Sequence, residues 1–155
     1  MKKTNAVRVL ESESIKHRIV VYEFNEEEID AVSVARKINM EPERVFKTLV
    51  AVAESKFYVV FCIPGNYELN MKKAAKEGGF KKIEMLKLKD LQDVTGYIRG
   101  GCSPIGMKKQ FPTYIDESAQ LFETIYVSAG VRGMQVELNP DDLIMLIKGK
   151  LVDLI

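Results

Sequence analysis

The chain contains two strongly apolar runs, Phe46-Lys47-Thr48-Leu49-Val50-Ala51-Val52-Ala53 and Phe57-Tyr58-Val59-Val60-Phe61-Cys62-Ile63-Pro64. They are separated only by Glu54-Ser55-Lys56. Valine and aromatic residues are frequent in both, which is typical of strands buried in a sheet. The short polar connection predicts an antiparallel hairpin. The other elements are expected to pack around this hairpin.

Periodicity and capping signals predict the elements on either side of the hairpin. Before it we expect a helix capped by Thr4 or Asn5, a strand, a second helix and a short helical turn, over Asn5–Glu13, Arg18–Phe24, Glu28–Ile38 and Met40–Glu43. After it we expect a helix begun by Asn70 and ended by Gly78-Gly79, a short strand over Lys82–Met85 and a short helix over Lys87–Val94. Strands are then expected over Thr113–Ile115, Thr124–Ser128 and Met134–Leu138, with a helical turn over Glu117–Leu121 and a final helix from Pro140 to about Lys148. Hairpins mixed with helices predict one α+β domain, residues 1–155, around a mixed sheet flanked by helices.

Composition narrows the class of protein. The 155 residues are 46% hydrophobic and 29% charged, with a net charge of +1, which is ordinary for a globular domain and excludes a polycation. Met1-Lys2-Lys3 is not followed by an apolar run, and the run from Val59 to Ile63 is too short to cross a bilayer. Two cysteines and one histidine give no disulfide or metal pattern. We therefore expect a cytoplasmic protein without a metal, a cofactor or a membrane partner.

A glycine-rich stretch follows, Thr95-Gly96-Tyr97-Ile98-Arg99-Gly100-Gly101-Cys102-Ser103-Pro104-Ile105-Gly106. It holds four of the ten glycines and a proline, so it does not form a regular element. One interpretation is an irregular loop. The other is a wall of backbone amides that faces an anion, a carbonyl or a developing oxyanion.

Lys47 is a lone cation in an apolar strand, and it also has two interpretations. It could protect the edge of a sheet against pairing with another chain. Alternatively, it is aimed into a cleft, where an ammonium group holds a phosphate or polarises a carbonyl.

Standard catalytic motifs do not account for the glycine-rich stretch. Cys102 has no neighbouring histidine to activate it, and Ser103 precedes a proline outside any Gly-x-Ser-x-Gly elbow. No Gly-Lys-Ser/Thr phosphate loop is present either. Two pairs of lysines flank the stretch and are candidates for contacts to a tRNA backbone if they converge: Lys72, Lys73, Lys108 and Lys109.

Three segments together resemble a known family. They are Val45-Phe46-Lys47-Thr48-Leu49, then Gly100 to Lys109, then Thr124 to Gly130 with Arg132-Gly133. They are similar to the YbaK type of aminoacyl-tRNA deacylases, free-standing relatives of the editing insertion domain of prolyl-tRNA synthetase. The similarity runs from about Ala6 to Ile155 and implies the same barrel-like editing fold.

The resemblance implies an enzyme that cleaves the ester of a mischarged tRNA(Pro), with cysteine as the wrong amino acid. Prolyl-tRNA synthetase is the implied transient partner, and DNA is not a partner. Small side chains are hard to tell apart by binding alone, so a second sieve is needed. The implied catalytic residues are Lys47, which holds the terminal adenosine or its phosphate, and Gly100 and Gly101, whose amides face the scissile carbonyl. The implied pocket residues are Tyr22, Tyr97, Cys102, Ser103, Ser128, Gly130 and Gln135.

The chain departs from the family pattern at three positions. Gln135 stands where an acid is usual, Ala129 replaces a glycine, and Cys102 replaces an aliphatic residue. Catalysis in the family is implied to be substrate-assisted, through the cysteine thiol or an adenosine hydroxyl. Alanyl-tRNA(Pro), a broader substrate range and a non-catalytic tRNA- or synthetase-binding module remain the alternatives.

Overall fold

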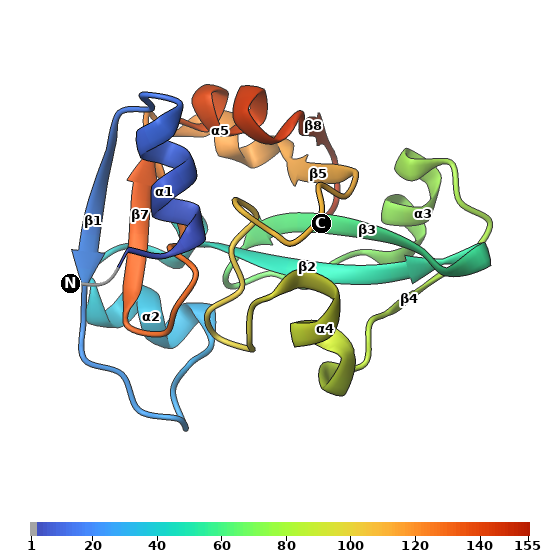
Figure 1. Ribbon diagram of the computed structural model, residues 1–155. Coiled ribbons are helices and arrows are strands. Elements are labelled where there is room, and N and C mark those ends of the chain that lie inside the picture. Colours follow the sequence, from blue (N-terminus) through green and yellow to red (C-terminus); the bar gives the residue numbers. More distant parts are fainter. Residues whose placement is uncertain (1–2) are drawn as a thin grey trace.

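The computed structural model describes residues 3–155, which form two β-sheets and five α-helices (Figure 1). The helices are α1 (Asn5–Ser12), α2 (Ala31–Lys37), α3 (Met71–Gly78), α4 (Leu91–Thr95) and α5 (Pro140–Ile147). The strands are β1 (His17–Val21), β2 (Phe46–Ala53), β3 (Phe57–Pro64), β4 (Ile83–Met85), β5 (Thr113–Asp116), β6 (Ile125–Ser128), β7 (Met134–Leu138) and β8 (Lys150–Val152). Short 3₁₀ turns occupy Pro42–Arg44, Glu54–Lys56, Leu88–Asp90 and Glu117–Leu121. No helix of the described part of the chain is long and apolar enough to cross a membrane.

The predicted hairpin is the centre of the larger sheet, whose strand order is β4-β2-β3-β5-β8. β2 and β3 pair antiparallel along their whole length, from Phe46 opposite Pro64 to Ala53 opposite Phe57. β5 lies parallel to β3, and β8 lies parallel to β5. The mixed sheet expected from the sequence is therefore confirmed, and residues 59–64 are buried because hydrophobic clusters cover both faces of β3.

The smaller sheet is antiparallel, in the order β1-β7-β6, and it runs across the end of the hairpin in Figure 1. A parallel bridge between Val45 and Tyr126 links the two sheets. Residues 3–155 form no closed barrel, so the barrel-like description was wrong in that detail. The physical reason is that β1, β6 and β7 pair only with one another, apart from that bridge.

Side-chain caps fix the helix starts. Thr4, Asp30, Asn70 and Asn139 each accept a hydrogen bond from a backbone N–H in the first turn of α1, α2, α3 and α5. Two predicted boundaries were wrong by three residues each, and one strand was not predicted. α2 starts at Ala31 rather than Glu28, because Asp30 is the cap. β1 ends at Val21 rather than Phe24, and the short edge strand β8 was not predicted.

Three clusters of buried side chains hold these layers together. The largest packs α1, α5 and the small sheet against one face of the hairpin, and includes Leu10, Val60, Ile105, Ile125 and Leu143. A second cluster lies on the opposite face of the larger sheet, under α3, and a third lies under α2. The fully buried Ile105 belongs to the glycine-rich stretch. This stretch is therefore part of the main core and not a detached loop.

Candidate functional site

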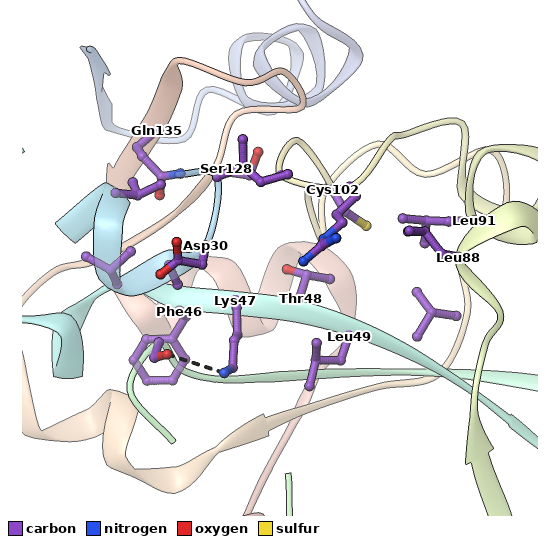
Figure 2. Close-up of a pocket in the computed structure, with 18 of the residues that line it drawn as sticks. Asp30, Phe46, Lys47, Thr48, Leu49, Leu88, Leu91, Cys102, Ser128 and Gln135 are labelled. Atoms are coloured by element: carbon purple, nitrogen blue, oxygen red, sulfur yellow. Dashed lines mark hydrogen bonds between the residues drawn. The ribbon is translucent and has the colours of Figure 1, made fainter. Parts of the chain in front are cut away.

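A cavity of about 370 Å³ lies along the first half of β2. It exists because β4 is short and pairs only with Ala51–Ala53, so no strand occupies the space beside residues 46–50. The N-terminal end of α2, α4, the glycine-rich stretch and the ends of β6 and β7 surround that space instead (Figure 2). The lining residues are Ile29, Asp30, Ala31, Val34, Val45, Phe46, Lys47, Thr48, Leu49, Val50, Gly65, Met85, Leu86, Leu88, Leu91, Arg99, Gly100, Cys102, Ser128 and Gln135.

Lys47 lines this cavity from an interior strand of the larger sheet. Its Nζ donates a hydrogen bond to the carbonyl oxygen of Gly65, at 3.3 Å. Loss of hydration on burial lowers the pKa of Lys47, and the charges of Glu68 and Asp30 oppose this shift. Figure 2 shows Lys47 and Thr48 on opposite faces of β2, with Thr48 toward Cys102. Although β4 leaves this part of β2 unpaired along one edge, the side chain of Lys47 lines the cavity, which favours the cleft interpretation.

The two adjacent glycines have different surroundings. Gly100 lines the cavity and has a φ of +83°, a conformation that side-chain-bearing residues rarely adopt. The N–H of Gly101 donates to the carbonyl oxygen of Ile98, at 2.9 Å, within the stretch itself. A Cβ on Gly101 would lie 3.0 Å from the Cα of Val131, so this glycine permits close packing of two backbones. The Gly101 N–H was predicted to face the scissile carbonyl of the substrate. In the structure it already donates to the carbonyl oxygen of Ile98, and this hydrogen bond competes with that role.

Ser128 and Gln135 enclose the cavity at the end of the small sheet, where they pair across β6 and β7. The Oγ of Ser128 accepts a hydrogen bond from the N–H of Gly130, at 3.1 Å. The side chain of Gln135 is buried, with 5% of the residue exposed. Its Oε1 has no hydrogen-bond partner within residues 3–155. A buried acceptor without a donor is costly, so this atom is ready to accept a donor from a ligand.

Cys102 also lines the cavity, and burial raises the pKa of its thiol to about 11. A thiol with that pKa is almost entirely protonated at neutral pH, and the thiolate is the nucleophilic form. Within the described residues, the cavity contains neither a histidine nor a group of acidic, histidine and cysteine side chains able to hold a metal. Its chemistry is that of amides, a few neutral polar groups and three charged side chains, those of Asp30, Lys47 and Arg99.

Four further residues predicted for the pocket lie outside this cavity. The Tyr97 hydroxyl donates to the carbonyl oxygen of Ile105, at 2.6 Å, and its ring packs over Gly130. Ser103 is fully buried, and its Oγ accepts from the N–H of Ile105. Tyr22 packs beside the cluster under α2. These contacts stabilise the fold. The substrate-binding roles of Tyr22, Tyr97, Ser103 and Gly130 remain predictions.

The flanking lysines lie on separate elements. Lys72 and Lys73 are on α3, where the Nζ of Lys73 lies 2.9 Å from an Asp153 carboxylate oxygen. The stem of Lys108 packs over Gly96, and its Nζ donates to the carbonyl oxygen of Asp93. Lys109 follows it on the connection to β5. Their proposed contacts with a tRNA backbone remain a prediction.

Sequence reasoning missed several residues of the cavity, including Asp30, Thr48, Leu88, Leu91 and Arg99. Asp30 carries a readable signal, since it caps α2 through Ser33, and the Ser33 hydroxyl lowers the pKa of its carboxyl group. Thr48 and Arg99 are neighbours in sequence of Lys47 and Gly100. The two leucines had no signal, because their position depends on how α4 packs against the open edge of β2.

The overall fold of the chain matches that of a solved structure. The chain superposes on a solved structure described as that of a putative trans-editing enzyme for prolyl tRNA synthetase, with a TM-score of 0.83 and 22% sequence identity, over 99% of this chain and 98% of the other. It therefore has the fold of the editing domains.

The chain belongs to the aminoacyl-tRNA editing domain family, whose family model matches residues 26–146. It is 51% identical, over 98% of its length and 93% of the relative, to a protein of Enterococcus faecalis named Putative Cys-tRNA(Pro)/Cys-tRNA(Cys) deacylase EbsC. It is also 30% identical to a proline–tRNA ligase of Shouchella clausii, over 64% of this chain and 17% of that enzyme. The family expected from the sequence motifs is thus confirmed.

Proposed function

We propose that this protein is an aminoacyl-tRNA deacylase that cleaves the ester of Cys-tRNA(Pro) in trans. Family membership and the similarity to EbsC support the reaction class. The observation that carries the proposal is the cavity itself, in which Lys47, Gly100 and the unpartnered Gln135 surround a small space. Its volume of about 370 Å³ suits a small amino acid and part of a ribose. The adenine would extend beyond it.

The opposite ends of the cavity would hold different parts of the substrate. Figure 2 shows the Lys47 side chain directed away from Ser128 and Gln135. The Lys47 ammonium group, beside the carbonyl oxygen of Gly65, would contact the terminal adenosine or its phosphate. The Gln135 Oε1 would accept a hydrogen bond from the ammonium group of the amino acid, which satisfies its buried acceptor. A neutral amide can do this where the family pattern has an acid.

Backbone amides would supply the electrophilic assistance. The N–H groups of Gly100 and Cys102 have no protein acceptor within residues 3–155, whereas the Gly101 N–H is bonded to Ile98. We therefore assign the oxyanion-stabilising role to the amides of Gly100 and Cys102 rather than to the adjacent glycine pair. Donors that are fixed before the reaction stabilise the developing charge without reorganisation. The buried anchors of the stretch hold these amides in place.

The protein would supply no nucleophile, because the protonated Cys102 thiol and the buried Ser103 hydroxyl lack an activating base. In one route the substrate thiol forms a bond from its sulfur to the ester carbon. The C–O bond to the ribose then breaks, and the thiol proton passes to the leaving ribose oxygen. In the other route an adenosine hydroxyl orients a water molecule, whose oxygen forms a bond to the same carbon. The C–O bond to the ribose then breaks, and a proton of that water passes to the leaving ribose oxygen.

A deacylation panel tests this proposal. We expect Cys-tRNA(Pro) to be discharged faster than Ala-tRNA(Pro) and Pro-tRNA(Pro). Lys47→Ala is expected to slow the discharge at least tenfold, whereas Lys150→Ala, an exposed lysine on β8, retains the parental rate. Tight tRNA binding with no discharge of any ester would contradict the proposal and favour a binding module. Full activity of Lys47→Ala would remove its assigned role.

A substrate analogue separates the two routes. 2-Aminobutyryl-tRNA(Pro) has a methyl group in place of the thiol, so it fills the cavity without offering a sulfur nucleophile. Discharge that is lost with this analogue indicates attack by the thiol. Discharge at the rate of the cysteinyl ester indicates that water attacks with help from the adenosine.

A further inference from the structure

A second cavity, of about 430 Å³, adjoins the first. The two share Ile29, Leu88, Leu91 and Arg99, which therefore form the boundary between them. The other lining residues of the second cavity are Glu26, Lys89, Gln92, Ile98 and Arg132. A ligand that fills the first cavity and continues past Arg99 would enter this second space.

Positive charge dominates the second cavity. Lys89, Arg99 and Arg132 face a single acid, Glu26. Within residues 3–155, none of these three cations forms an ion pair with a carboxylate, in contrast to Arg18, Arg36 and Arg44. Unpaired cations that share a concave surface attract an anion and can hold it by charge-assisted hydrogen bonds.

The two arginines are held beside the glycine-rich stretch. The Nε of Arg132 donates to the carbonyl oxygen of Arg99, at 2.9 Å. The same Nε would lie 3.2 Å from a Cβ placed on Gly100. Arg132 thus connects the turn between β6 and β7 to Arg99, which lines the first cavity. This contact uses Nε and leaves the terminal guanidinium nitrogens for a ligand.

Apolar side chains accompany these cations. Leu88 is 58% exposed and Ile98 is 42% exposed, although both line the cavity. Exposed apolar side chains beside unpaired cations match the two parts of a nucleotide, namely a flat base and a phosphate. A phosphate suits the planar fork of an arginine, and bases bind apolar and aromatic side chains in single-stranded recognition.

We propose that the second cavity binds the penultimate nucleotide of the acylated strand, with Arg99 and Arg132 on the phosphodiester that links it to the terminal adenosine. The proposal rests on the proposed function, which places that adenosine at the first cavity. Lys89 contributes positive charge at the outer side, and Leu88 and Ile98 contact the base. Only a polynucleotide substrate would therefore occupy the second cavity, whereas the aminoacyl ester of adenosine is sufficient to occupy the first.

Kinetics with two substrates test the proposal. Arg99→Gln and Lys89→Gln are each compared with Arg8→Gln, which removes the same charge from an exposed position on α1. With Cys-tRNA(Pro), we expect the first two variants to raise KM about tenfold. With the cysteinyl ester of adenosine alone, their effect on KM should be at least five times smaller. Equal effects on the two substrates, or no effect on tRNA, would overturn the proposal.

Direct binding keeps the inference separate from catalysis. The probe is the uncharged trinucleotide CCA, whose affinity is measured at several salt concentrations. We expect Arg99→Gln to weaken its binding at least fivefold and to reduce the salt slope by about 0.7, the value for one phosphate contact on a single strand. Arg8→Gln should match the parent protein. If the parent binds CCA no better than Arg99→Gln does, the site is absent, whether or not any ester is cleaved.

Discussion

The two walls of the cavity achieve a fixed geometry by different means. The β2 wall, Phe46–Val50, is a regular strand that is paired along one edge and left open along the other by the short β4. The loop wall, Arg99–Cys102, contains no regular element and depends on anchors on either side of it in the chain, chiefly Tyr97, Ser103 and Ile105. A strand gains its shape from ladder hydrogen bonds, whereas this loop gains it from side chains buried in the core.

This contrast determines which groups each wall can offer to a ligand. The alternation of β2 places Lys47 and Thr48 on opposite faces, so adjacent residues serve different parts of the cavity. In the loop, neighbouring amides have different tasks, since Gly101 bonds to Ile98 while Gly100 lines the cavity. The position of each functional group therefore depends on the strand or loop that carries it, and a shift of the group would disturb that element.

The largest expected effect breaks the loop wall at its anchor. Ile105→Ala removes a fully buried side chain and should lower the free energy of unfolding by about 2–5 kcal/mol. Chemical denaturation measures this change. Ile98→Ala truncates an isoleucine of the same stretch that is 42% exposed, and it should cost less than about 0.5 kcal/mol. Similar losses for the two variants would show that the stretch is not anchored in the core.

The next effect sharpens the role of a single loop residue. Gly100→Ala requires alanine at a φ of +83° and places its Cβ 2.9 Å from the Cβ of Ile29, so we expect the rate of deacylation to fall about 10- to 100-fold. Gly79→Ala is the matched control, because it has a φ of +73° with no atom within 4 Å of the added Cβ. This control should lose about 1 kcal/mol of stability and no activity. Equal activity of the two variants would contradict a specific role for Gly100.

The smallest effect at neutral pH concerns the β2 wall. Burial lowers the pKa of Lys47 from its ordinary value of 10.5, so the ammonium form is lost earlier as the pH rises. The quantity to measure is the rate of enzymatic deacylation divided by the rate of spontaneous deacylation. If the Lys47 charge holds the substrate, this ratio is constant near neutral pH. It then falls by about tenfold per pH unit above the lowered pKa. Lys47→Arg should abolish this decline, because a guanidinium group stays charged. A decline that persists in this variant would assign the titration to another group.

The sequence by itself determined the hairpin, most of the helices and strands, and the family. These features depend on local patterns: continuous apolar runs in β2 and β3, capping residues such as Asn70 and Asn139, and three motifs in a fixed order. It also singled out Lys47 and Gly100, because a cation in an apolar strand and a glycine cluster are each unusual. The boundaries that failed, at Phe24 and Glu28, lie where the chain turns from one sheet to the next helix.

Only the tertiary structure decided what surrounds these residues. The open edge of β2 follows from the register of the short strand β4, whose length was predicted within one residue but whose pairing partner was not. The internal bond of Gly101, the unpartnered Oε1 of Gln135 and the meeting of Arg99 with Arg132 each join groups by long-range packing or by one particular turn. Periodicity reports which face of an element is buried. It cannot report which distant groups meet there, because that depends on how the two sheets and the glycine-rich stretch pack together.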